Sequence, residues 1–169
     1  MQRILVIGSG GSGKTTVARE IAHRLGLPLV HLDALYWQPG WRPTDKPAWE
    51  AIVREQIAGP RWVMDGNYSG TLDLRLARCD TVVFLDLPRG VCLWRVARRW
   101  LAFRGRTRPD MARDCPERIT WEFVRWIWTY PARRRAGILR RLAQMRADQR
   151  AIVLSSSAAI RRFLAELHR

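Results

Sequence analysis

Short apolar runs alternate along the chain with longer segments in which apolar residues recur at helical spacing. In segment 14–26, Val17, Ile21 and Leu25 recur every four residues, and Gly26 follows where a C-terminal cap is expected. The apolar runs predict buried strands at 3–8, 27–33, 61–66, 80–88 and 150–155. The helically spaced segments predict helices at 14–26, 46–59, 89–103, 119–131 and 132–147, with a last amphipathic helix after the final strand. The Pro- and Gly-rich or charged segments 33–45 and 104–118 are predicted to be loops.

This alternation of strands and helices predicts an α/β fold, in which helices bury both faces of a parallel sheet. No repeat or change in composition marks a second domain, so residues 1–169 are expected to form one domain. No apolar run is long enough to span a bilayer, and no signal peptide or membrane partner is expected. Cys79, Cys92 and Cys115 form no CxxC motif and no cluster with histidine. A cytoplasmic protein with reduced thiols and no zinc site is therefore expected.

The charge of the chain is strongly positive and unevenly distributed. Thirty Lys and Arg residues stand against 15 Asp and Glu, a formal net charge of +15. Residues 89–146 hold sixteen arginines and four acidic residues, and hence +12 of that charge. Such a field attracts phosphates, from nucleotides to nucleic acid, or it belongs to solvated helix surfaces of an arginine-rich protein.

Segment 8–15, GSGGSGKT, matches the phosphate-binding motif G-x-x-x-x-G-K-[ST] at every fixed position, between a predicted strand and a predicted helix. Glycines let successive backbone N–H groups surround a phosphate, and the helix N-terminus adds partial positive charge. Lys14 is one of only two lysines, and its compact ammonium suits the β- and γ-phosphate oxygens better than a guanidinium fork. The Thr15 hydroxyl is placed to ligate Mg²⁺. The predicted ATP·Mg²⁺ site therefore comprises Gly8, Ser9, Gly10, Gly11, Ser12, Gly13, Lys14, Thr15 and Thr16.

Beyond this loop the chain resembles a known group of enzymes. The strand pattern, the "MDG" that ends the third predicted strand and "FLDLP" followed by "WRVARR" are similar to adenylate-kinase-like P-loop kinases. The segments "HLDALYWQPGW", "WVMDGNY" and "CPERITWEFVRWIWTYP" resemble most closely the DNA topology modulation (FlaR-type) proteins, which are kinase-like by sequence. The resemblance covers nearly the whole chain. It implies a three-layer α/β/α P-loop NTPase fold, with a five-stranded parallel sheet in the nucleoside-monophosphate-kinase order 2-3-1-4-5 and a short arginine-rich lid at about 104–116.

The resemblance assigns roles to residues after the second and third predicted strands. It implies that Asp65 holds the water shell of Mg²⁺, with capping of the next turn as the alternative. Where the family has an arginine for the phosphate of a nucleoside monophosphate, this chain has Asn67 and Tyr68, which suit hydrogen bonds to an uncharged acceptor. Asp33 matches an Asp that accepts the proton of the attacking hydroxyl or binds substrate, with a turn or capping role as the alternative. Trp37 follows on a predicted loop, where it can stack on a planar acceptor or pack over the core.

Arginines after the fourth predicted strand match those that neutralise phosphate charge in the kinase family. Arg95 and Arg99 share a helix face, and the resemblance places one against the adenine and the other toward the transferred phosphate. Arg98 is the alternative if the helix is rotated. On or beside the lid, Arg113 and Arg118 bracket DCPE and are the preferred catalytic pair. The remaining lid arginines, expected to be solvated, are Arg104, Arg106 and Arg108.

Three further segments have simpler explanations. Trp121, Val124 and Trp128 lie at helical spacing and are predicted to pack in the core rather than stack on bases. The tract RRRAGILRR at 133–141 is predicted to be a solvated amphipathic face rather than a DNA-binding element. Ser156, in the turn after the last strand, matches the adenine-contacting loop of the kinases, although small residues in a turn need no such role.

Three functions are compatible with this sequence. A kinase that transfers the γ-phosphate of ATP·Mg²⁺ to a small-molecule or nucleotide-type acceptor is favoured, because an arginine-rich lid serves phosphoryl transfer in a closed site. A nucleic-acid-associated NTPase is the first alternative, but the chain has no helix-turn-helix, zinc finger or other recognisable reader module. A nucleotide-binding regulatory protein with little turnover is the second. The motifs define neither the acceptor nor the oligomeric state.

Overall fold

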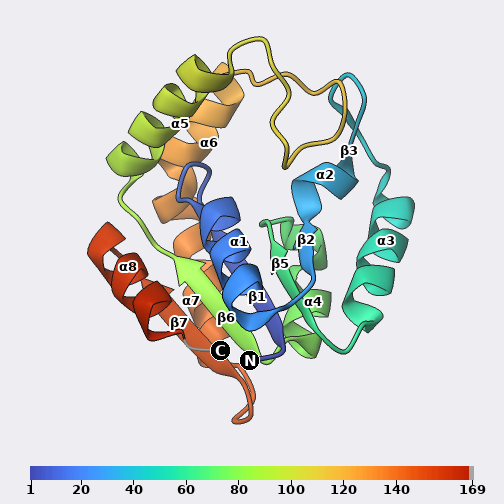
Figure 1. The fold of residues 1–169 in the computed structure, drawn as a ribbon, viewed down its shortest axis with the longest axis vertical. Coiled ribbons are helices and arrows are strands. Elements are labelled where there is room, and N and C mark those ends of the chain that lie inside the picture. The colour runs from blue at the N-terminus through green and yellow to red at the C-terminus, as the bar shows by residue number, and fades with distance from the viewer. Residues whose placement is uncertain (168–169) are drawn as a thin grey trace.

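The structure is a computed structural model in which residues 1–167 are described. Five parallel strands form its central sheet, in the order β2–β5–β1–β6–β7 (Figure 1). These strands are β1 (Arg3–Gly8), β2 (Leu29–His31), β5 (Trp62–Asp65), β6 (Thr81–Leu85) and β7 (Arg150–Leu154). When only these five strands are numbered along the chain, their order in the sheet is 2-3-1-4-5. The expected α/β fold and strand order are confirmed.

Helices cover both faces of the sheet and complete the three expected layers (Figure 1). The longer ones are α1 (Lys14–Leu25), α3 (Lys46–Ala58), α4 (Leu72–Arg78), α5 (Arg89–Phe103), α6 (Trp121–Tyr130), α7 (Ala136–Ala143) and α8 (Ser157–Glu166). Apolar side chains of α1 and α8 share one buried cluster with the sheet, and those of α3, α4 and α7 share a second cluster. α5 and α6 stand beside the loop that follows β1, so they flank the predicted phosphate site (Figure 1).

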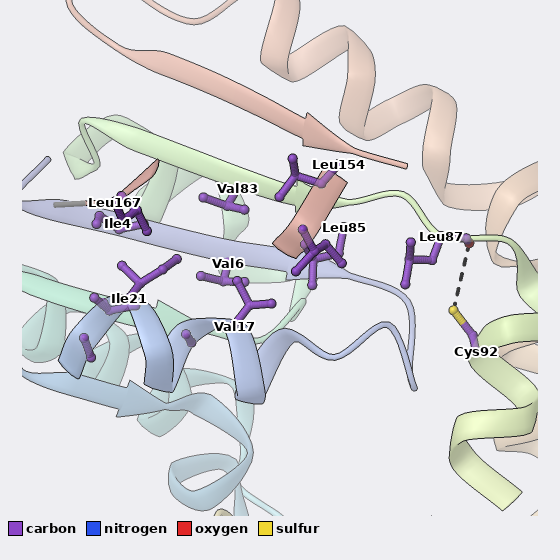
Figure 2. Close-up of a cluster of buried hydrophobic side chains, with 14 of the residues drawn as sticks. Ile4, Val6, Val17, Ile21, Val83, Leu85, Leu87, Cys92, Leu154 and Leu167 are labelled. Atoms are coloured by element: carbon purple, nitrogen blue, oxygen red, sulfur yellow. Dashed lines mark hydrogen bonds between the residues drawn. The ribbon is translucent and has the colours of Figure 1, made fainter. Parts of the chain in front are cut away.

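The pleat of β1 divides the core between these two faces. Ile4 and Val6 pack in the cluster with α1 and α8, whereas Leu5 and Ile7 pack in the cluster with α3, α4 and α7. All four side chains are at most 1% exposed. Figure 2 shows the first cluster, in which Ile4 and Val6 lie above side chains of α1. Burial on both faces explains why positions 4–7 of this strand are all apolar.

The segment after β2 differs from its prediction. The strand ends at His31, because residues Leu32–Tyr36 form a short helix, α2. This turn buries the Leu32 side chain completely, against Gly66. Asp33 therefore lies in the first turn of a helix instead of at the end of a strand.

The predicted loop 33–45 is more ordered than its composition suggests. After α2 the chain forms a two-stranded hairpin, β3 (Trp37–Gln38) with β4 (Arg42–Pro43), and Gly40 in its turn has a φ of +76°. The 3₁₀ turn η1 (Ser69–Thr71) and helix α4 lie in a segment without a prediction. A helix of seven residues offers too few turns for periodicity to show.

The helical segment that follows the lid is continuous instead of divided at Pro131. A π-helical turn, η2 (Pro131–Arg135), joins α6 directly to α7. Proline has no N–H to donate and its ring crowds the preceding turn, and the wider π turn accommodates both effects. The chain therefore stays helical from α6 through α7.

The buried face of α6 is also not the predicted one. Trp121 is 74% exposed and Trp128 51% exposed, whereas Ile127 and Tyr130 are buried. The prediction that the Trp121–Trp128 stripe packs in the core is therefore wrong. α6 is apolar on nearly every side, so periodicity cannot select its buried face, and contacts with the rest of the fold decide it.

Cys79, Cys92 and Cys115 are buried, and no disulfide joins them in the described chain. None of the helices within residues 1–167 combines the length and the apolar character that a bilayer span requires.

Candidate active site

The phosphate-binding loop lies at the carboxyl end of β1, where it leads into α1 (Figure 1). Gly11 and Gly13 have φ values of +75° and +95°, left-handed conformations that glycine adopts without steric cost. A side chain at Gly11 would also collide with the carbonyl oxygen of Cys92 in α5. The loop is thus held close to α5 in a conformation that brings backbone N–H groups and the N-terminus of α1 to one place.

Lys14 is the first residue of α1, and its side chain folds back over the loop. Its Nζ donates a hydrogen bond to the carbonyl oxygen of Ser9 at 2.9 Å. Burial lowers the pKa of Lys14, while the nearby carboxylates of Asp33 and Asp65 act in the opposite direction. Both carboxylates therefore lie close enough to interact electrostatically with the ammonium that a phosphate would meet.

Asp65, at the end of β5, is 5% exposed and both its carboxylate oxygens have partners. The Thr15 hydroxyl donates to Oδ2 at 2.7 Å, and His31 Nδ1 lies 2.7 Å from Oδ1. The hydrogen bond to Asp65 is the main cause that raises the pKa of His31. His31 and Asp65 are register partners on adjacent parallel strands. His31 was not singled out from the sequence, although the predicted pairing of the second and third strands places it beside Asp65.

The pair formed by Thr15 and Asp65 fits a Mg²⁺ ion that arrives with a nucleotide. Both offer hard oxygen atoms, which Mg²⁺ prefers, and one or two such protein ligands suffice when phosphates and water complete the shell. Residues 1–167 contain no group of three His, Cys, Asp or Glu side chains that could hold a metal without a nucleotide. The direct hydrogen bond between the two residues would rearrange when such an ion binds.

Asp33 is held by Tyr68 and interacts electrostatically with Lys14. The Tyr68 hydroxyl donates to Asp33 Oδ1 at 2.6 Å. Burial and the charge of Asp33 raise the pKa of Tyr68 far above its usual value, so the phenol remains a neutral donor. This contact orients the carboxylate, and its second oxygen has no protein partner in the described chain.

The side chains of Asn67 and Trp37 both make contacts within the protein. The Asn67 amide donates to the carbonyl oxygen of Gly8 at 2.6 Å and accepts from the Gly8 N–H at 3.1 Å, so it ties the β5 loop to the start of the phosphate-binding loop. The half-buried Trp37 ring packs edge-on against Tyr36, with centroids 5.0 Å apart. The predicted acceptor roles of Asn67, Tyr68 and Trp37 remain predictions.

Arg75 was not singled out from the sequence, yet it shapes the loop that carries Asn67 and Tyr68. Its side chain is fully buried, and its guanidinium donates to the carbonyl oxygens of Gly66, Asn67 and Tyr68. Burial lowers the pKa of Arg75 to about 10. A buried arginine on a short helix has no local sequence pattern that would distinguish it from a solvated one.

The rotation of α5 places Arg95 and Arg99 toward the site and Arg98 toward solvent. Arg95 Nη1 donates to the Ser12 carbonyl oxygen at 3.0 Å, and Nη2 donates to the Ser157 hydroxyl at 3.0 Å. Arg98 is exposed and lies over the Trp94 ring. Ser156 caps α8 by accepting from the Ala159 N–H. Ser157, rather than Ser156, is therefore the residue of this turn that meets Arg95.

Arg99 belongs to a buried ionic cluster with residues of the lid. Its guanidinium contacts Glu117 Oε1 at 2.8 Å, and Arg108 Nε lies 2.7 Å from Glu117 Oε2. Arg108 also pairs with Asp110 at 2.7 Å. Arg99 is close enough to Lys14 that its charge contributes to lowering the lysine pKa. The side chain of Arg108 is only 11% exposed, so the expectation that it is solvated is wrong.

The loop 104–118, which contains the predicted lid at about 104–116, reaches from the end of α5 to the β3–β4 hairpin (Figure 1). The Gly40 N–H donates to the Asp114 carbonyl oxygen at 3.0 Å, and Trp41 Nε1 donates to the Pro116 carbonyl oxygen at 3.1 Å. Arg113 and Arg118 are exposed, and Arg118 lies over the Trp41 ring. The structure thus brings Arg99 together with Arg108 and Glu117, not with the predicted pair, whose catalytic role remains a prediction.

The chain resembles kinases of known structure over nearly its whole length. No protein-family model matches the chain. The shikimate kinase from Acinetobacter baumannii, solved in complex with shikimate, is 18% identical, with 98% of this chain and 90% of that chain covered and a TM-score of 0.62. The shikimate kinase from Bacteroides thetaiotaomicron is 18% identical over 98% of this chain and 95% of its own, with a TM-score of 0.56. This chain has a P-loop kinase fold.

Two further comparisons agree with that fold. The gluconokinase from Sinorhizobium meliloti 1021 is 19% identical over 98% of this chain and 95% of its own, with a TM-score of 0.51. The cytidylate kinases of two Nitratidesulfovibrio vulgaris strains are 39% identical over 62 residues, which is 36% of this chain. The chain matches only 27% of the length of these curated relatives. None of the relatives named here is a DNA topology modulation protein, so that resemblance remains a hypothesis.

Proposed function

We propose that this protein is a kinase that transfers the γ-phosphate of ATP, bound with Mg²⁺ at the P-loop, to a hydroxyl group of a small-molecule or nucleotide-type acceptor. The observation that carries the proposal is the position of Asp33, whose carboxylate is held by the Tyr68 hydroxyl at 2.6 Å and interacts electrostatically with the P-loop ammonium of Lys14. A nucleotide phosphate bound at Lys14 would therefore lie near a carboxylate that can orient an acceptor hydroxyl and accept its proton.

In this proposal each group has a distinct task. Lys14 and Arg99 supply the positive charge that stabilises the phosphoryl oxygens in the transition state. Bound Mg²⁺ would neutralise charge on the β- and γ-phosphates, with Thr15 and Asp65 as the residues that hold it and its water shell. The lid, closed against the hairpin, excludes water from the transfer. The kinase names of the structural relatives support the same class of activity.

A screen of acceptors tests this function. Purified protein is incubated with ATP and Mg²⁺ and with shikimate, gluconate, cytidylate or a wider panel of hydroxyl compounds. ADP release is compared with that of the same mixture without an added acceptor, in which water is the only acceptor. We expect one acceptor class to raise ADP release and to yield a phosphorylated product by mass spectrometry. ADP release that no acceptor increases but that duplex DNA stimulates would favour the alternative of a nucleic-acid-associated NTPase.

That alternative has one structural observation in its favour. Trp94, Trp121 and Trp128 are exposed on α5 and α6, and Arg98 and Arg89 lie over the rings of Trp94 and Trp128. Exposed aromatic and arginine side chains are typical of surfaces on which bases stack. Filter binding at two salt concentrations distinguishes the hypotheses, because a phosphate-binding surface loses affinity steeply as salt rises.

The two carboxylates should fail in different ways when each is made neutral. Asp65→Asn is expected to lower turnover and to raise the Mg²⁺ concentration needed for half-maximal activity, because Asp65 adjoins Thr15. Asp33→Asn should chiefly reduce acceptor-dependent turnover, with a normal Mg²⁺ requirement and normal basal ATP hydrolysis, because the hydrogen bond of Asp33 is to Tyr68 and not to Thr15 or Asp65. Identical effects of both substitutions on basal hydrolysis and on Mg²⁺ dependence would contradict this division of roles.

A further inference from the structure

A hollow of about 460 Å³ lies between the η1–α4 segment and the helical segment formed by α6, η2 and α7. Ile7 of β1 and Leu72 of α4 contribute apolar atoms to its lining, and Trp126 and Tyr130 of α6 add aromatic surface. Asn67 and Tyr68 line it as well, so it adjoins the loop that also contacts Gly8 and Asp33. Apart from the predicted acceptor contacts of Asn67 and Tyr68, no role assigned above involves the residues of this hollow.

The charged side chains that line the hollow all carry the same sign. They are Arg133, Arg134, Arg140 and Arg141, and no acidic residue lines it. Arg141 is neutralised by Asp73 at 2.7 Å, and Arg134 makes a long contact of 3.4 Å to the Ser69 hydroxyl. The guanidinium groups of Arg133 and Arg140 are exposed and have no hydrogen-bond or ion-pair partner within residues 1–167. At least two guanidinium groups at the hollow are thus free to bind an anion.

The aromatic part of the lining is suited to a flat body. Trp126 packs edge-on against Tyr130, with centroids 5.1 Å apart, and Ile138 contributes further apolar surface. The Tyr130 side chain is 5% exposed, and its hydroxyl is buried without a hydrogen-bond partner in the described chain. A buried hydroxyl without a partner is costly, and a polar atom of a ligand can satisfy it.

The π-helical turn η2 and Gly137 shape the lining of the hollow. η2 places Arg133 and Arg134 just after Tyr130, and α7 continues the same lining with Ile138 and Arg141. π turns interrupt a helix at a cost and occur frequently at functional sites. Gly137 lies in this lining, and an added Cβ there would meet only the tip of Arg141, at 3.8 Å. The absence of a side chain at Gly137 therefore leaves room that any larger residue would fill.

We propose that this hollow binds a phosphate monoester with a flat, apolar body, at a site separate from the phosphate-binding loop. A phosphate is favoured over a carboxylate because Arg133 and Arg140 together carry two uncompensated charges, which match a dianion. The apolar and aromatic lining accommodates the body of the ligand. The tract 133–141 is then more than the solvated face that its sequence predicts. This inference does not depend on the proposed kinase activity.

Phenyl phosphate is the probe, because it joins a dianionic phosphate to a flat ring. Binding is measured by isothermal titration calorimetry, without nucleotide, and compared with phenol and with inorganic phosphate. We expect saturable binding of phenyl phosphate, weaker binding of inorganic phosphate and none of phenol. An Arg133→Ala/Arg140→Ala double variant should weaken phenyl phosphate binding at least tenfold, because both free guanidinium groups are lost.

Three further variants keep the test specific. Gly137→Leu should also weaken binding at least tenfold, because it fills the hollow, leaves every arginine in place and suits a helix better than glycine. Arg161→Ala/Arg162→Ala removes the same charge from exposed positions of α8 and should leave binding unchanged. Lys14→Ala removes the ammonium of the phosphate-binding loop, so the binding that persists in this variant is binding at the hollow. The proposal is overturned if phenyl phosphate does not bind, if the α8 variant weakens binding equally, if Gly137→Leu has no effect, or if Lys14→Ala alone abolishes binding.

Discussion

Replacing Lys14 with alanine is expected to abolish acceptor-dependent ATP turnover, with a loss on the order of 10³-fold or more. The ammonium is the cation that the fold places over the phosphate-binding loop, and Asp33 and Asp65 both interact with it electrostatically. Without it, the β- and γ-phosphates lose a donor that becomes more important as charge develops on the transferring group. ATP affinity, measured by calorimetry, should fall as well.

The fold should survive the Lys14 substitution, since the only hydrogen bond that the side chain makes in the described structure is to the Ser9 carbonyl oxygen. Circular dichroism and the thermal unfolding midpoint should therefore match those of the unsubstituted protein. Lys46→Ala provides the control, because Lys46 is the other lysine of the chain and is exposed at the start of α3. Undiminished turnover in a folded Lys14→Ala protein would rule out the role assigned to this residue.

Arg99→Ala is expected to lower turnover on the order of 10²-fold, with a much smaller change in the Michaelis constant for ATP. Arg99 lies near Lys14 and connects α5 to Glu117 just beyond the predicted lid, so in the proposed reaction it is the arginine that stabilises the phosphoryl group during transfer. An interaction that strengthens only in the transition state changes turnover more than ground-state binding. Steady-state kinetics with the acceptor identified by the screen would measure both parameters.

The neighbouring helix position supplies a matched control for Arg99. Arg98→Ala removes the same charge from the exposed side of α5, where Arg98 contacts only Trp94, and should leave turnover within about twofold. Loss of Arg99 does not leave the buried Glu117 carboxylate without a cation, because Arg108 pairs with its other oxygen. Unfolding midpoints of the two variants should therefore remain similar. Equal kinetic losses in both would indicate a general effect of charge and would contradict a specific role for Arg99.

Much of the fold follows from patterns within short stretches of chain. Helix α5 begins at Arg89 and ends at Phe103, as its apolar spacing predicts. The runs that predicted β1, β5 and β6 are buried on both sheet faces, which favours apolar side chains, whereas the edge strands β2 and β7 are only partly buried. Where an element is short, as α2 and α4 are, the pattern has too few positions to define it, and strand β2 was predicted too long for that reason.

The candidate site also contains residues that a local motif identifies and residues that only tertiary contacts bring together. Residues joined by contiguous sequence, such as Lys14 and Thr15, were identified because the geometry of their loop depends on neighbouring glycines. The pairing of His31 with Asp65 joins strands 34 residues apart. The contact of Arg99 with Glu117 depends on how α5 is rotated and how the lid folds over it. Neither the rotation of α5 nor the path of the loop over it is visible in local sequence patterns.

The amino-acid sequence by itself determined that this protein has a P-loop between the first strand and first helix of a parallel α/β sheet. Local steric freedom at glycine and the periodicity of apolar residues require only neighbours along the chain. Tertiary structure alone decided which arginines meet a carboxylate, which tryptophans remain exposed and where Arg133 and Arg140 line a hollow. The physical reason is that α5, α6 and α7 are apolar or basic on several sides. Only packing against the sheet and the lid selects which of those sides is buried.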